Sequence, residues 1–253
     1  MTSPDTPADA AAPPPPPGTP SPGPPSARVA LAEVVLCSGF PTQLAIAGVL
    51  RLGGLTATDE AGRLSPAFLF TLSLADSVLL LGLILLCLRA HGERARDVFL
   101  GSRPVWREAL VGVALAPLLL TATLTLLLVL RRVVPALHNV PDNPLGALAD
   151  SPAAVALFLI VVLVAGGLRE ELQRAFLLHR FEQRLGGAWM GLVVTSVAFG
   201  LGHTLQGRDA AIATGVLGFV WGLLYLARRS SIAPIVSHAL FNSAELLRAV
   251  LMR

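Results

Sequence analysis

Apolar runs of about 20 residues, the length that a helix needs to cross a bilayer, alternate with short polar links along most of this chain. Backbone polar groups in lipid must pair within their own segment, and these runs are too long for barrel strands, so we expect helices. The pattern predicts an all-α, polytopic transmembrane helical bundle of seven spans, or eight if one of them splits. The predicted spans cover residues 29–52, 66–88, 109–130, 153–185, 188–204, 210–227 and 232–251.

Residues 1–28 have a different composition, because eleven of the 20 prolines of the chain fall there. Such a stretch cannot bury a core, and we predict a disordered, partly polyproline-II tail. It lacks the basic segment followed at once by an apolar stretch that marks a signal peptide. After the tail we expect N-terminal transmembrane helices over residues 29–150 and a transmembrane core over residues 151–253.

The overall composition supports a membrane protein. The chain is 54% hydrophobic and 14% charged, whereas soluble globular proteins carry about 25% charged residues. The formal net charge of +3 is too small and too scattered for a nucleic-acid partner. All 19 basic residues are arginine, which we interpret as the signature of a GC-rich bacterial genome and hence of a bacterial inner membrane.

The positions of the arginines predict an orientation. With seven spans, ten arginines fall on the side of the N-terminus and seven on the opposite side. The positive-inside rule then places the N-terminus in the cytoplasm.

Two glycines of the sixth span, Gly218 and Gly222, have the GxxxG spacing. Glycine is common in membrane helices, but small residues at this spacing also let two helix backbones approach closely. We predict that these glycines pack against a neighbouring helix.

Polar and ionisable residues interrupt three of the last four spans. Such residues are costly in hydrocarbon, so they are a functional-site hypothesis by default. They recur at a spacing of four residues, which places both members of a pair on one face of a helix. The pairs are Glu170 and Arg174, Phe199 and His203, and His238 and Asn242.

Each pair has a structural interpretation as well as a chemical one. One of the adjacent carboxylates Glu170 and Glu171 suits a general base in a dry site, yet these charges also fit a helix end at the membrane surface. His203 is typical of an interfacial histidine too. His238 and Asn242 offer hydrogen-bond donors or a metal-binding nitrogen, or else a polar clamp between helices.

Together, the three groups supply what a peptidase needs. A carboxylate can take a proton from water, a histidine can position that water, and a histidine–asparagine pair can stabilise an oxyanion or hold a metal. The HExxH signature of soluble zinc proteases is absent from the sequence. No serine or cysteine nucleophile has a histidine at a motif spacing.

The three groups resemble the motifs of the CAAX-protease and bacteriocin-processing family of intramembrane proteases, also called type II CAAX endopeptidases. The Glu-Glu…Arg, Phe-x-x-x-His and His-x-x-x-Asn motifs of that family occur here in the same order, over residues 153–251. The resemblance implies that a glutamate and His203 activate water, that His238 and Asn242 stabilise the oxyanion, and that other motif residues support them. The supporting residues are Arg174 and Phe199.

The first motif departs from the family pattern by one residue. The family has Glu-Glu-x-x-x-Arg, whereas only two residues separate Glu171 from Arg174 here. If Arg174 is aligned with the arginine of the family pattern, Arg169 takes the first glutamate position and Glu170 takes the second. If the glutamate pair is held instead, Arg174 comes one residue early. We favour Glu170 as the base, because its spacing to Arg174 places both side chains on one face, with Glu171 as the alternative.

The cofactor and the depth of the site stay open at this point. The family is commonly labelled a metalloprotease, and Glu170, His203 and His238 are ligands that zinc accepts, although a glutamate mechanism without metal uses the same residues.

At about 1.5 Å per residue, Glu170 lies roughly 25 Å along the fourth span, while His203 lies late in the fifth span, which runs the opposite way. Either the fourth helix is long and tilted, with Glu170 near the middle of the membrane, or one segment is broken or re-entrant, for which Gly166 and Gly167 are a plausible site.

We therefore expect an endopeptidase that acts on a membrane-associated protein or peptide, such as a bacteriocin precursor, a pheromone or a membrane-protein fragment, with lipids as its other partners. A non-proteolytic scaffold or immunity-type protein with the same fold is the alternative, and the altered first motif favours it. A proton-coupled transporter fits less well, because no inverted repeat of broken helices is visible in the sequence.

Overall fold

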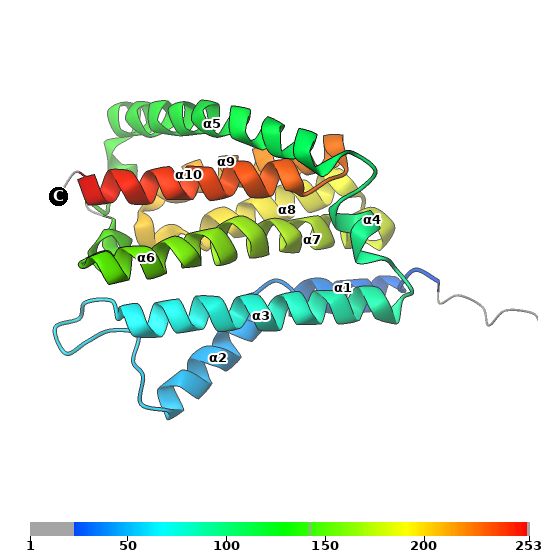
Figure 1. The fold of residues 1–253 in the computed structure, drawn as a ribbon, viewed down its shortest axis with the longest axis horizontal. Coiled ribbons are helices and arrows are strands. Elements are labelled where there is room, and N and C mark those ends of the chain that lie inside the picture. The colour runs from blue at the N-terminus through cyan, green and yellow to red at the C-terminus, as the bar shows by residue number, and fades with distance from the viewer. Residues whose placement is uncertain (1–22, 142, 252–253) are drawn as a thin grey trace, which may run out of the picture.

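The computed structural model describes residues 23–141 and 143–251, and this part of the chain forms a helical bundle (Figure 1). The predicted disordered tail lies outside the described residues, except for the segment just before the first helix. The elements are α1 (Ala27–Leu36), α2 (Phe40–Leu52), α3 (Pro66–Ala90), α4 (Ala95–Phe99), α5 (Val105–Val133), η1 (Pro135–Leu137), η2 (Pro144–Leu148), α6 (Pro152–Val161), η3 (Val162–Arg169), α7 (Glu170–Arg184), α8 (Ala188–Leu201), η4 (Thr204–Gln206), α9 (Arg208–Arg228) and α10 (Ile232–Leu251).

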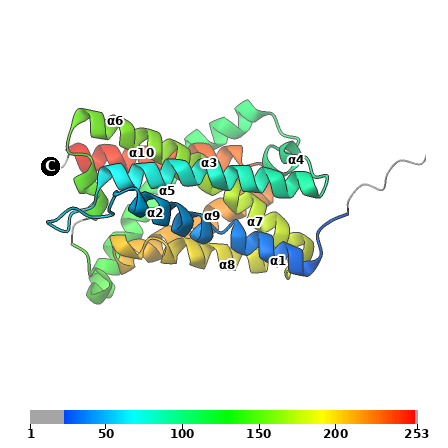
Figure 2. The same ribbon diagram turned by 90° about the horizontal axis from the view of Figure 1, so that it is seen from below.

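Successive long helices run in opposite senses along the longest axis of the molecule (Figure 1), and α5 crosses α3 and α10 at a steep angle (Figure 2). Among the described residues, five helices are long and apolar enough to cross a membrane by length and composition. These are Ala27–Leu52, Pro66–Ala90, Val105–Val133, Pro152–Arg184 and Arg208–Arg228. The predicted helical membrane bundle is confirmed, although α8 is shorter than a full span and α10, which carries the third motif, is not among the five.

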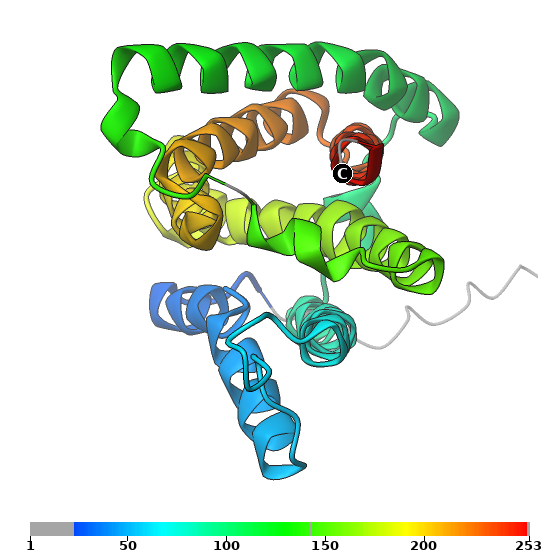
Figure 3. The ribbon, with the colours of Figure 1, turned by 90° about the vertical axis from the view of Figure 1, so that its left-hand side faces the viewer.

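The first predicted span consists of two helices. α1 ends at Leu36 and α2 begins at Phe40, because Gly39 between them has a φ of +90°, which glycine adopts without steric penalty. Pro41 lies in the first turn of α2, where its missing N–H leaves no helical hydrogen bond unmade. α2 therefore slants away from the rest of the bundle (Figure 3).

The fourth span is one long helix with a widened segment in its middle. α6 continues into the π-helix η3, which contains Gly166 and Gly167, and η3 continues into α7. Such π segments are rare and frequently lie at functional sites. The glycines also let α10 approach closely, since a Cβ on Gly167 would lie 2.8 Å from the Cβ of Ala239. The sequence left open whether the fourth span is one long helix or is irregular at this glycine pair, and the structure has both features: a 33-residue helix that contains the π segment.

The glycines of the GxxxG motif lie at a close contact between α9 and α8. A Cβ on Gly218 would lie 2.8 Å from the ring of Phe199, and one on Gly222 would lie 2.5 Å from Leu192. The predicted packing role of these two glycines is confirmed, and Gly218 leaves the space that the Phe199 ring occupies.

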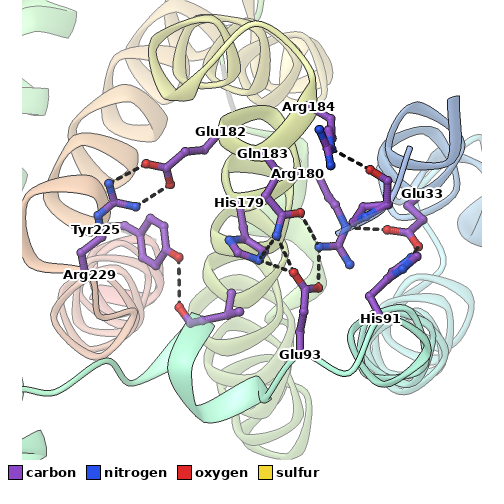
Figure 4. Close-up of polar contacts among 12 residues, drawn as sticks. Glu33, His91, Glu93, His179, Arg180, Glu182, Gln183, Arg184, Tyr225 and Arg229 are labelled. Atoms are coloured by element: carbon purple, nitrogen blue, oxygen red, sulfur yellow. Dashed lines mark hydrogen bonds and ion pairs between the residues drawn. The ribbon is translucent and has the colours of Figure 1, made fainter. Parts of the chain in front are cut away.

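A buried arginine fixes the end of α7 that is remote from the π-helix (Figure 4). The Arg180 side chain is fully buried; its Nε donates to Glu33 at 2.5 Å and its Nη1 donates to Glu93 at 2.6 Å. The other carboxylate oxygen of Glu33 lies 2.8 Å from Nε2 of His91. The other carboxylate oxygen of Glu93 lies 2.8 Å from Nε2 of His179. This network ties α7 to α1 and to the link between α3 and α4.

Replacing Arg180 with methionine is expected to destabilise the protein by about 3–5 kcal/mol, because Glu33 and Glu93 would lose their shared cation. Thermal unfolding in detergent micelles measures the change. Arg89→Met is the matched control, since Arg89 is exposed at the end of α3. Equal shifts of Tm in the two variants would contradict the anchoring role of Arg180.

Glu93 gives the network a defined response to acid. Burial raises the pKa of the Glu93 carboxyl, and hydrogen bonds from Gln183, Arg180 and His179 lower it. Together the hydrogen bonds outweigh burial, so the pKa lies below its usual 4.5. A carboxyl with a lowered folded-state pKa stabilises the fold above its unfolded pKa and loses that contribution as pH falls through the folded value. On acidification below pH 4.5, the Tm of the wild type should therefore fall more steeply than that of Glu93→Gln. Parallel curves of Tm against pH would refute this.

Candidate active site

A buried ion pair within α7 forms the centre of the polar core. Glu171 Oε1 pairs with Arg174 Nη1, and the two residues are only 2% and 4% exposed. Residues three apart are neighbours on a helix surface, as are residues four apart. The expected pairing of Arg174 with Glu170 is wrong, because Arg174 pairs with Glu171, whereas the basic nitrogen nearest to Glu170 is Nε2 of His238 on α10.

The imidazole of His238, on α10, lies between the two glutamates. Its Nδ1 is 2.7 Å from Glu171 Oε1, and its Nε2 is 3.8 Å from Glu170 Oε2. Because a carboxylate oxygen accepts hydrogen bonds, Nδ1 carries a hydrogen and donates it to Glu171. Nε2 is therefore the nitrogen that faces Glu170, at a distance slightly longer than a hydrogen bond.

Aromatic rings enclose the polar core. Trp221 stacks on the His238 ring, with centroids 3.8 Å apart and an interplanar angle of 15°. Phe199 presents its ring nearly perpendicular to His238, with centroids 6.1 Å apart. The guanidinium of Arg174 lies 4.6 Å from the centroid of Phe199. These rings exclude water, and a low local dielectric strengthens the hydrogen bonds that they surround.

A cavity of about 430 Å³ lies beside this core. Its wall includes Glu170, Arg174 and Phe199, together with apolar side chains from α1, α2, α7 and α8. The Glu170 side chain is 21% exposed, whereas that of Glu171 is 1% exposed and does not line the cavity. A ligand in the cavity would therefore meet the carboxylate of Glu170.

His203 lines the same cavity as Glu170. His203 follows the end of α8, and its Nδ1 donates to the backbone oxygen of Phe199 at 2.8 Å. The other ring nitrogen, Nε2, takes no part in this hydrogen bond. The sequence suggested that Glu170 and His203 lie at different depths in the membrane. Two features of the structure remove this difference. Glu170 lies near the middle of the 33-residue helix Pro152–Arg184, and α8, with 14 residues, is too short to carry His203 across a bilayer.

Asn242 lies one turn after His238 but is not among the residues that line the cavity. Its Nδ2 faces the π-helix and occupies the space where a side chain at Gly166 would begin. In this arrangement Asn242 packs α10 against η3, and its oxyanion role stays a prediction.

Arg169, which one register places at the first glutamate position of the family, takes part in a separate ion pair. It is buried, and its Nη2 pairs with Asp76 of α3. Asp76 also accepts a hydrogen bond from Thr42 Oγ1 at 2.5 Å. Arg169 thus connects η3 to α3 and α2.

The three expected zinc ligands do not fit a metal ion in this arrangement. Glu170 and His238 approach each other, but the imidazole of His203 packs against Phe199, with centroids 4.7 Å apart. Over residues 23–141 and 143–251, no three His, Cys, Asp or Glu side chains form a group that could hold a metal.

Sequence reasoning brought together most of this site but missed Trp221 and Asp76. Both side chains are almost fully buried, at 1% and 2% exposure. Trp221 belongs to no motif, and a single aromatic residue in an apolar helix gives no signal of its own. Asp76 could have been found as an isolated charge within the apolar second span.

One comparison with known proteins bears on this site. Residues 152–244 match the family model described as type II CAAX prenyl endopeptidase Rce1-like. No curated protein and no solved structure shows significant similarity to the chain. The matched segment contains every candidate site residue from Glu170 to Asn242.

Exchanging each glutamate for glutamine should separate their roles in the fold. Glu171→Gln is expected to destabilise the protein by about 3–5 kcal/mol, because Arg174 would remain as a buried and unpaired charge. Glu170→Gln should leave Tm nearly unchanged, since Glu170 is partly exposed and its nearest basic nitrogen is 3.8 Å away. Thermal unfolding in detergent tests this, and a larger loss of Tm for Glu170→Gln would reverse the assignment.

Proposed function

We propose that the protein is an intramembrane endopeptidase in which Glu170 is the general base, because residues 152–244 match the family model of type II CAAX prenyl endopeptidases. The observation that carries the assignment of the base is that Glu170, and not Glu171, lines the cavity and faces Nε2 of His238. The substrate would be a membrane-associated protein or peptide, such as a bacteriocin precursor, a pheromone or a membrane-protein fragment.

The balance of charges supports this role for Glu170. Glu171 and Arg174 neutralise each other, so the carboxylate of Glu170 is left beside the imidazole of His238. A hydrogen on Nε2 of His238 would give this nitrogen a hydrogen bond to donate beside Glu170. His238 is buried and does not itself line the cavity, and its Nε2 approaches the site beside Glu170, at 3.8 Å from Oε2.

The proposed reaction moves one proton twice. His203 orients a water molecule in the cavity, and Glu170 takes a proton from this water as its oxygen attacks the carbonyl carbon of the substrate. The Nε2–H of His238 donates a hydrogen bond to the oxyanion that develops on the carbonyl oxygen. Glu170 then returns the proton to the departing amine nitrogen as the C–N bond breaks.

The distribution of arginines supports a cytoplasmic N-terminus. Arg28 in the first turn of α1 and Arg89 in the last turn of α3 lie at the end of the bundle that also carries α4 (Figure 1). At the opposite end, Arg131 is neutralised by Asp209. We propose that the arginine-rich end faces the cytoplasm of a bacterial cell, in keeping with the positive-inside rule.

Turnover of quenched fluorescent peptides by the purified protein in detergent tests the proposal. Glu170→Gln is expected to lower kcat by about 10²–10⁴-fold, because the base is lost. Glu60→Gln is the matched control, since Glu60 is exposed in the loop before α3. Full activity of Glu170→Gln would exclude it as the base. A wild type that turns over no peptide on a broad panel would favour the non-proteolytic scaffold, which the buried Arg169 at the altered motif also suggests.

Removing metal tests the cofactor separately. The proposed steps use only side chains of this chain, because the candidate ligands do not fit a metal in their present arrangement. We expect kcat to stay unchanged after dialysis against a strong chelator. Loss of activity that zinc restores would show that Glu170, His203 and His238 rearrange into a metal site.

A further inference from the structure

We propose that Trp221 is a positioning residue for the reaction: it holds the imidazole of His238 so that Nε2 faces Glu170. The inference rests on the proposed function, because it concerns the same site. Trp221 lies on α9, outside all three motifs, and does not line the cavity. Any effect that it has on the reaction must therefore pass through the residues that it contacts.

The indole of Trp221 controls the plane of the His238 ring. The two rings are nearly parallel, at 15°, with their centroids 3.8 Å apart, and Trp221 is 1% exposed. Contact of this kind over a whole face opposes any rotation of the imidazole out of its plane. The hydrogen bond from Nδ1 to Glu171 acts at one edge of the ring, so the two contacts restrict different motions.

Trp221 is itself fixed by the helix that carries His238. Its Nε1 donates to Ser237 Oγ at 3.1 Å, and Ser237 Oγ donates to the backbone oxygen of Ala233 at 2.9 Å. Phe241 packs against the indole nearly at right angles, with centroids 6.0 Å apart. Because Ser237 directly precedes His238, the indole is held in register with the ring on which it stacks.

Kinetics of two substitutions give the first test. Trp221→Leu removes the aromatic face and should lower kcat about 10–100-fold, as expected for a misplaced catalytic group, with KM unchanged within about twofold. Trp221→Phe keeps a face but loses the N–H, and it should recover most of kcat. Trp189→Leu is the matched control, because Trp189 is 66% exposed at the start of α8, and it should match the wild type. Wild-type kcat in Trp221→Leu would overturn the proposal.

Histidine NMR provides a test that needs no substrate. In protein labelled with ¹⁵N-histidine, the signals of His238 are those missing from His238→Gln. In the wild type, each ring nitrogen of His238 should give one sharp signal. In Trp221→Leu both signals should shift and broaden, because the ring is no longer held in one plane. Unchanged His238 signals in Trp221→Leu would overturn the positioning role.

Folding and function can be separated in these experiments. If Trp221→Leu does not fold, Ser237→Ala replaces it, since this variant frees the indole N–H while keeping both rings, and smaller changes in the same direction are expected. Wild-type His238 signals in Ser237→Ala would then count against the proposal. A wild type with no peptidase activity but with His238 signals that depend on Trp221 would overturn the proposed function alone.

Discussion

The site depends on the ion pair between Glu171 and Arg174. Two charges can be buried in this setting only when they compensate each other and their remaining hydrogen-bonding groups are satisfied. The pair meets that condition by bonding to His238 and by placing the guanidinium against Phe199. The arrangement leaves Glu170 as the glutamate that faces the cavity, so two adjacent residues of one type acquire different environments.

Close approach of α10 to the π-helix is the geometric condition for this arrangement. Gly166 and Gly167 have no side chains to separate the two helices, and Ala239 and Asn242 fill that space from the side of α10. His238 lies on the same stretch of α10 and so comes within reach of both glutamates. The π segment in front of α7 thus links a packing feature to the proposed chemistry.

The N-terminal helices contribute by holding η3 and α7 from their other side. Arg169 pairs with Asp76 of α3, and Arg180 pairs with Glu33 of α1 and with Glu93. These two anchors lie about three helical turns apart along η3 and α7. The cavity is bounded partly by α1 and α2, so the same helices that anchor α7 also form a wall of the site.

The sequence by itself determined the helices, the three motifs and the close packing at Gly218 and Gly222, because apolar length and local spacing do not depend on distant partners. Tertiary structure alone decided that Arg174 pairs with Glu171, since residues three and four apart share a helix face and only the position of His238 on α10 selects between them. It also decided that Trp221 stacks on His238, because nothing local to a tryptophan in an apolar helix specifies which ring packs against it.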